Sequence, residues 1–249
     1  MSTITFKNAP VVINGVTKLA SEASISENLS YERKDELGAE IVRTVPNERT
    51  AGSFSMSYYL SDSDSAIRGL TGYSPVTGKI GDYGFISGFM TRYSISVDPN
   101  EPIQANLSVD FYSAINRSMA TGTSPSGGLD LAHGGGSIAS GVSFNTGLFS
   151  FDYEISQTFT PYLQLGNTGL MSVERTNGSI SCSLKGSGLA DAVADDFCDS
   201  GTGISLNLKT LCGTSIGTIQ ESGMKLADCK ISIDNASDVI GEVSLIKYF

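Results

Sequence analysis

The sequence predicts a mainly β protein made of two tandem copies of one small β-sandwich or barrel domain. Three observations indicate this class. Gly, Ser, Thr and β-branched residues are frequent, as in strands joined by many turns. Apolar and polar residues alternate in several segments. A ten-residue motif also occurs twice in the 249 residues: 48–57 reads ERTAGSFSMS and 174–183 reads ERTNGSISCS, with seven identical positions.

The duplication extends beyond this motif. The two copies lie 126 residues apart, and upstream the pair 29–30 matches 155–156 at the same offset. Downstream, 95–98 matches 231–234 at an offset of 136 residues, which holds to the end of the chain. A period of this length is that of a small domain rather than of a solenoid repeat.

We therefore predict three segments. A first domain with an N-terminal arm occupies 1–117, a Gly/Ser-rich connector 118–141, and a second domain 142–249. The arm contains Asn14-Gly15, a dipeptide that favours tight hairpin turns. The connector is expected to be extended or flexible rather than packed.

Each domain is predicted to follow the order β-β-α-β-β with one short helix. In the first copy the strands are expected at 23–31, 52–60, 90–98 and 103–112, with the helix at 66–70; in the second, strands are expected at 178–184, 226–234 and 239–248, with the helix at 189–197. Charged segments follow the first strand of each copy, at 32–47 and about 158–172. They are predicted to be exposed loops.

The composition argues against several functions. The net charge is −10 and no basic patch is present, so a sequence-reading nucleic-acid binder is not expected. The four cysteines all lie in the second half without a C-x-x-C pair, which favours buried free thiols over a metal site or disulfides. The single histidine, His133, lies in the connector, where a solvated side chain is expected. No constellation indicates an enzyme, a metal or a cofactor. The N-terminus lacks an apolar signal segment, and no run is long enough to span a membrane.

The polar sides of the predicted strands carry short hydroxyl, amide and acidic side chains, where Lys, Arg, Glu and Thr are more usual. These residues are Ser53, Ser55, Ser57, Ser94, Ser96, Asp98, Asn106, Ser108, Asp110, Ser179, Ser181, Ser183, Ser232, Asp234, Glu242 and Ser244. Lys230 is the exception, and Asp234 on the same side is expected to offset its charge. Such a surface offers phosphate little to hold.

With these features the chain resembles bacteriophage tail tube proteins, a family that includes the haemolysin-coregulated tube protein of type VI secretion. The resemblance covers about 20–113 and 142–249. It rests on the strand and helix order, the charged loop, the Ser-alternating strands and the acidic hydroxyl side. It implies rings of edge-to-edge sheets that stack into a tube around passing DNA. Two domains per chain imply a trimer with pseudo-sixfold symmetry.

The resemblance also implies where the chain works and what it contacts. The polar residues above would line the lumen, without specific DNA binding. Glu32, Arg33, Lys34, Asp35 and Glu36 would contact the neighbouring ring. Further partners would be other copies of the chain, tape-measure, terminator and baseplate proteins, and a sheath in contractile tails. The protein would assemble in the host cytoplasm and reside in the virion tail, away from membranes.

Two other functions remain open from the sequence. A tail hub or distal ring of the same fold would form single rings that do not stack. A β-sandwich carbohydrate-binding module or adhesin would display aromatic platforms, ideally Trp, and a secretion signal. The sequence contains no Trp.

Overall fold

The structure, a computed structural model, describes residues 10–28, 31–34, 43–46, 51–117, 130–136, 138–140, 142, 144–163, 170–189, 202–233 and 239–249. Strands make up 75% of these residues, which confirms the mainly β prediction. Twelve strands join in one sheet in the order β6-β1-β2-β5-β8-β7-β10-β11-β14-β13-β12-β9. In chain order these strands are β1 (Pro10–Ile13), β2 (Val16–Asn28), β5 (Ala51–Tyr59), β6 (Val76–Ile80), β7 (Tyr83–Val97), β8 (Gln104–Phe111), β9 (Ile138–Ser140), β10 (Phe144–Leu163), β11 (Leu170–Leu189), β12 (Thr202–Lys209), β13 (Ser215–Ile233) and β14 (Val239–Tyr248).

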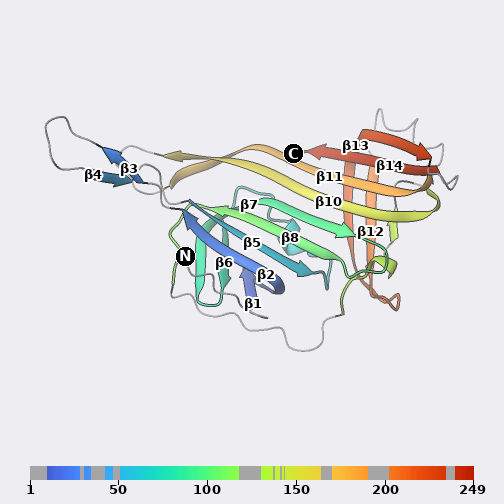
Figure 1. Ribbon diagram of the computed structural model, residues 1–249, viewed down its shortest axis with the longest axis horizontal. Coiled ribbons are helices and arrows are strands. Elements are labelled where there is room, and N and C mark those ends of the chain that lie inside the picture. Colours follow the sequence, from blue (N-terminus) through green and yellow to red (C-terminus); the bar gives the residue numbers. More distant parts are fainter. Residues whose placement is uncertain are drawn as a thin grey trace.

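The first half of the chain forms a closed six-stranded barrel (Figure 1). Strands β6, β1, β2, β5, β8 and β7 follow one another, and pairing of β6 with β7 closes the circle. Asn14 and Gly15 both have positive φ and form the predicted tight turn between β1 and β2. The interior is mostly apolar because alternate residues of each strand point inward, as Phe54 and Met56 of β5 do.

The second half repeats the strand order of the first. Strands β9, β10, β11, β12, β13 and β14 take the places of β1, β2, β5, β6, β7 and β8, with the same neighbours in the sheet. The repeated motif occupies the equivalent strands β5 and β11. In the described part of the chain, however, no pairing joins β9 to β10, so this half stays open where the first half is closed.

The two halves join through β7 and β10. Residues 92–97 of β7 pair antiparallel with 151–156 of β10. Strand β7 thus has two partners on one edge, because its first residues pair with β6 and its last residues with β10. A single cluster of buried apolar side chains includes residues of both halves.

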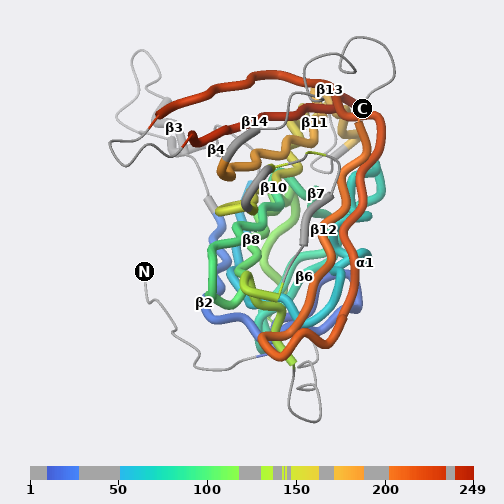
Figure 2. Tube along the Cα trace, turned by 90° about the vertical axis from the view of Figure 1, so that its right-hand side faces the viewer, coloured from blue at the N-terminus to red at the C-terminus, as the bar shows by residue number. Residues whose placement is uncertain are grey.

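Strand β13 changes direction near its middle (Figure 2). Residues 215–224 pair with β12, and residues 225–233 pair with β14. Its first half therefore runs along the side of the first barrel, near the short helix α1 (Ser65–Arg68), while its second half continues the long sheet (Figures 1 and 2).

The charged segments differ from the predicted loops. Strands β3 (Tyr31–Lys34) and β4 (Arg43–Pro46) pair with each other as a separate hairpin. In the second half the corresponding segment prolongs β10 and β11, which pair as far as Leu163 and Leu170. Asp35 and Glu36 lie outside the described residues, as does most of the helix predicted at 189–197. Gly186, expected before that helix, lies in β11.

The connector prediction is wrong for the described part of its second half, 130–136 and 138–140. Ala132 is fully buried, its N–H donates to the Leu60 carbonyl, and its own carbonyl accepts from the N–H of Ile103. Strand β9 pairs with β12, and a short 3-10 helix, η1 (Gly134–Gly136), precedes it. His133 is half-buried rather than solvated, and its N–H donates to the carbonyl of Lys209.

The prediction of buried thiols is confirmed for one cysteine and wrong for two. Cys182 lies in the core of the second half, where burial raises the pKa of its thiol. Cys212 and Cys229 are free and exposed. Cys198 lies outside the described residues.

Candidate functional site

The most extended functional feature is the polar face, by which we mean the solvent side of the eight adjacent strands β2, β5, β8, β7, β10, β11, β14 and β13. All of the sequence-predicted polar residues that the structure describes are exposed or half-buried and lie in these strands or at their ends. Asp234 lies outside the described residues. Register brings residues from distant parts of the chain into rows: Ser57, Asn106, Ser94, Glu154 and Ser181 lie on consecutive strands.

Hydroxyl groups in the first half interact across strands. The hydroxyls of Ser24 and Ser55 lie 2.8 Å apart, and those of Ser26 and Ser53 lie 2.9 Å apart. The Ser57 hydroxyl donates to Asn106 Oδ1 at 2.6 Å. These side chains stay short and close to the sheet, so the surface is wettable without long, mobile charged groups.

The polar face continues across the junction of the two halves. The Ser96 hydroxyl on β7 donates to Asp152 Oδ1 on β10 at 2.6 Å. One row away, an Arg92 guanidinium nitrogen lies 2.7 Å from Glu154 Oε2. At the junction, backbone pairing and side-chain contacts both join β7 to β10, so the polar face continues from the first half into the second.

Cations on this face lie next to carboxylates. Glu242 on β14 is the strand partner of Lys185 on one side and of Lys230 on the other. The neighbour of Lys230 across strands is thus Glu242, whereas the sequence had suggested Asp234. In the first half, burial raises the pKa of the Asp110 carboxyl above its usual range.

Sequence reasoning missed the contribution of the first strand in each half. Glu22, Ser24 and Ser26 of β2 and Asp152 and Glu154 of β10 belong to the same rows. The alternation of these polar residues with apolar neighbours could have identified them from the sequence. The sequence could not show which of these strands lie side by side, because that depends on pairing between segments far apart in sequence.

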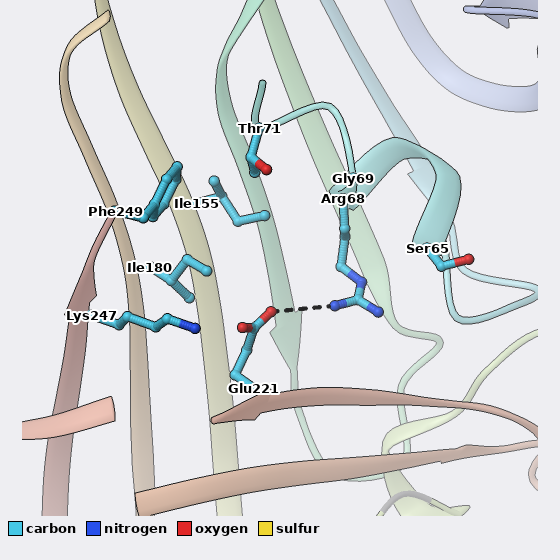
Figure 3. Close-up of a pocket in the computed structure, with 9 residues that line it drawn as sticks. All are labelled: Ser65, Arg68, Gly69, Thr71, Ile155, Ile180, Glu221, Lys247 and Phe249. Atoms are coloured by element: carbon cyan, nitrogen blue, oxygen red, sulfur yellow. Dashed lines mark ion pairs between the residues drawn. The ribbon is translucent and has the colours of Figure 1, made fainter. Parts of the chain in front are cut away.

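A cleft of about 400 Å³ lies between α1 of the first half and the sheet of the second (Figure 3). Arg68 and Glu221 face each other across it at 3.5 Å, both mostly buried. The Tyr153 hydroxyl donates to the same Glu221 oxygen at 2.8 Å, and burial beside this carboxylate raises the pKa of the tyrosine. Arg175 adds a hydrogen bond to the Thr71 carbonyl at 2.6 Å. The Arg68–Glu221 ion pair and the Arg175–Thr71 hydrogen bond connect the two halves.

The cleft does not present reactive chemistry. Its lining combines the Arg68–Glu221 ion pair with a lysine, two hydroxyl side chains, a glycine, and aliphatic and aromatic side chains: Ser65, Arg68, Gly69, Thr71, Ile155, Ile180, Glu221, Lys247 and Phe249. Within the described ranges, no group of three or more His, Cys, Asp or Glu side chains is placed to hold a metal ion. We therefore regard the cleft as a packing interface between the halves.

No family model matches the chain, and no curated protein matches it. In the described part of the chain, no helix is long and apolar enough to cross a membrane. The polar face and the edges of the sheet are the features of the molecule that point to a function.

Proposed function

We propose that this chain is the subunit of a bacteriophage tail tube, a stack of rings whose lumen conducts DNA. The observation that carries the proposal is the polar face, continuous over eight strands and over the junction between the halves. Three chains per ring would place six domains around the lumen. Tape-measure, terminator and baseplate proteins, with a sheath in contractile tails, would be the other partners.

The chemistry of the polar face suits a DNA conduit. Each unpaired lysine or arginine on a lumen wall would release counterions from DNA and so bind phosphate, and such contacts would add up around every ring. Here Arg92 is paired with Glu154, and Lys185 and Lys230 flank Glu242. Serine hydroxyls keep the wall wet, while carboxylates repel phosphate.

Electron microscopy of the purified protein tests the assembly. Long hollow tubes are expected, with native mass spectrometry giving multiples of three chains. Rings that never stack would support a hub or distal ring instead. A stable monomer at micromolar concentration, with no rings, would overturn the proposal.

A second experiment tests the lumen. Ser55→Arg combined with Ser181→Arg places one cation in each half of the polar face, where both side chains reach solvent. Tubes should still form, but DNA ejection should slow, most strongly at low salt. The control is Thr77→Arg, at the exposed position of strand β6, which lies outside the polar face. Equal ejection rates in all three proteins would contradict the assignment of this face to the lumen.

A further inference from the structure

The first barrel holds one lysine in contact with two aspartates, away from both the polar face and the cleft. Lys18 lies in β2, and Asp62 and Asp64 lie in the segment between β5 and α1. Lys18 Nζ lies 2.8 Å from Asp64 Oδ1 and 3.1 Å from each oxygen of the Asp62 carboxylate. The side chains of Lys18 and Asp64 are 8% and 1% exposed, whereas that of Asp62 is 56% exposed. An amine and a carboxyl group are thus held together out of water.

Asp64 reaches this position through an unusual backbone conformation. It stands directly before α1, where an aspartate side chain commonly caps the first helical turn, yet it makes no side-chain cap hydrogen bond. Its φ is 52°, in the left-handed region that residues with a Cβ rarely adopt. Such strain persists only where the surrounding structure imposes it, and it is frequent at functional sites. The carboxylate is turned into the barrel instead of capping the helix.

The two oxygens of the Asp64 carboxylate have different surroundings. Oδ2 accepts hydrogen bonds from the hydroxyls of Tyr58 and Tyr93, the second at 2.9 Å. Oδ1 is buried and accepts no hydrogen bond from the described residues, and its close contact is with Lys18 Nζ. Burial raises the pKa of both tyrosines above the usual range, so both hydroxyls keep their protons and remain donors. The surroundings therefore favour negative charge on Oδ2 and leave Oδ1 to the amine.

We propose that Lys18 and Asp64 join covalently, through an isopeptide bond between Nζ and Cγ that the folded barrel forms on its own. The substrate is the chain itself, and the two tyrosine hydroxyls and Asp62 supply the chemistry. This modification does not depend on the proposed function, because it takes place within a single subunit.

The reaction needs no oxidant, reductant or cofactor. One proton passes from the Lys18 ammonium to Asp64 Oδ1, which gives a neutral amine beside a carboxylic acid. Nζ then attacks Cγ, and the electron pair of the Cγ–Oδ2 double bond moves to Oδ2, where the tyrosine hydroxyls stabilise it. Asp62 takes a second proton from Nζ and delivers it to Oδ1. The Cγ–Oδ1 bond breaks, one water leaves, and the Cγ–Oδ2 double bond forms again.

Proximity and burial both favour the amide over the ion pair. Two groups held in reacting geometry behave as if each were present at up to about 10⁵–10⁸ M, which offsets the tendency of water to hydrolyse an amide. A buried ion pair also bears the desolvation cost of two charges, and a neutral amide does not. Because Asp62 is exposed, the departing water has a route to solvent.

The protonation of Lys18 makes the reaction slow. Burial lowers the pKa of this amine, but attraction to Asp64 and Asp62 outweighs burial and raises the pKa above its usual value. The amine is therefore rarely neutral, and freshly purified chains hold the ion pair. Conversion proceeds while the folded protein is stored, so the stability of the ion-paired chain is measured on fresh protein.

Intact mass spectrometry of the full chain tests the bond. After a week at physiological temperature, most folded chains should have lost the mass of one water, whereas chains kept in concentrated urea should not. Lys18→Met, which lacks the amine, should keep its full mass. An unchanged mass of the folded parent would overturn the proposal and leave Lys18 and Asp64 as a structural ion pair only.

Peptide mapping locates the link. Trypsin cannot cleave after an acylated Lys18, so residues 8–33 should remain one peptide, joined to residues 50–68. An aspartate can also lose water by closing a succinimide on its own backbone, but trypsin would then still cut after Lys18 and release 8–18. Water loss accompanied by a free 8–18 peptide would contradict the bond.

A variant at the exposed aspartate protects the test against folding failure. Asp62→Asn removes the proton carrier but keeps the Lys18–Asp64 contact, so its thermal midpoint should stay within a few degrees of the parent. General acid–base catalysis contributes about 10²–10⁴-fold, and the rate of water loss should fall at least tenfold. The matched control, Asp98→Asn, changes another exposed aspartate and should convert at the parental rate. Conversion of Asp62→Asn at that same rate would contradict the proposed proton transfer.

Discussion

The two halves of the chain share one strand order, yet among the described residues only the first half closes. Its barrel closes through β6 and β7, and a two-residue turn at Asn14 and Gly15 keeps β1 on β2. In the second half the described residues of β9 pair with β12 alone. In the described residues, closure thus accompanies a tight hairpin at the start of the repeat, and the order of the other strands is the same in the half that lacks this pairing.

The interiors of the halves also differ in chemistry. The first barrel buries Lys18 against Asp64, with Nζ 2.8 Å from the carboxylate, and the hydroxyls of Tyr58 and Tyr93 donate to the same carboxylate. At the repeat positions of Tyr58 and Tyr93, the second half has Leu184 and Cys229. Leu184 and Cys229 therefore cannot repeat the two tyrosine hydroxyls that bind the buried Asp64 carboxylate in the closed half.

Loss of this network should lower the unfolding free energy more than any of the other substitutions that compare the two halves. Lys18→Met leaves the Asp64 carboxylate buried without its cation, which typically costs about 3–5 kcal/mol of unfolding free energy. Urea titration would measure this loss of unfolding free energy. Lys225→Met, at an exposed position of the second half, should change stability by less than about 0.5 kcal/mol. Similar small effects of both substitutions would show that the network does not stabilise the barrel.

The repeated motif offers a matched glycine pair for the next test. A Cβ at Gly52 would lie 2.1 Å from the Phe111 ring and 2.5 Å from the backbone oxygen of Ser26. At the equivalent Gly178 the nearest atoms, 3.0 Å away, belong to the last residue, Phe249. Gly52→Ala should cost about 1–3 kcal/mol through overpacking, and Gly178→Ala clearly less. Thermal midpoints would rank the two variants, and the reverse order would contradict the expected difference in packing.

Loss of the ion pair between the halves should lower the unfolding free energy by a smaller amount. Glu221→Gln removes the charge that faces Arg68 but keeps an acceptor for the Tyr153 hydroxyl, so about 1.5 kcal/mol of unfolding free energy should be lost. Limited proteolysis should show faster cleavage of the second half. Glu242→Gln, exposed on the polar face, is the control and should leave cleavage unchanged.

The smallest predicted effect is a change of stability with pH. Burial lowers the pKa of Lys18, but attraction to Asp64 and Asp62 outweighs it, and the pKa is raised above its usual value. The folded protein therefore holds this proton more tightly than the unfolded chain. Its contribution is complete below about pH 10, near the ordinary lysine pKa, and is lost as the pH rises through the folded pKa. The stability gap between the parent and Lys18→Met should stay constant from pH 7 to 9 and narrow above about pH 10.5. A stability gap that already narrows between pH 7 and 9 would contradict the raised pKa of Lys18.

The sequence predicted much of this architecture because its signals are local or repeated. Alternation placed Phe54 and Met56 inside and Ser53 and Ser55 outside, and the duplicated motif predicted equivalent strands in both halves. The pairing of β7 with β10 was not predictable, since alternation shows which side of a strand is buried but not which strand lies beside it.

The other failures have similar causes. The second half of the connector is rich in small residues that resemble a flexible linker. Ala132 nevertheless fits into the core, because its N–H donates to the Leu60 carbonyl and its own carbonyl accepts from the N–H of Ile103. Cys229 is exposed because it lies on the part of β13 that pairs only with β14. Both outcomes depend on tertiary neighbours that composition does not encode.

The closed barrel also has a consequence for synthesis on the ribosome. All of its strands lie between Pro10 and Phe111, so it can fold before the second half exists. The edge of β7 then stays unpaired until β10 has been synthesised. The residues of β10 that pair with it begin 54 positions after Val97. At about 5–20 residues per second, translation leaves this edge uncovered for roughly 3–11 s. Chains arrested soon after Arg117 has left the exit tunnel should already resist protease, and on crowded polysomes their bare β7 edges are where nascent neighbours would be expected to cross-pair.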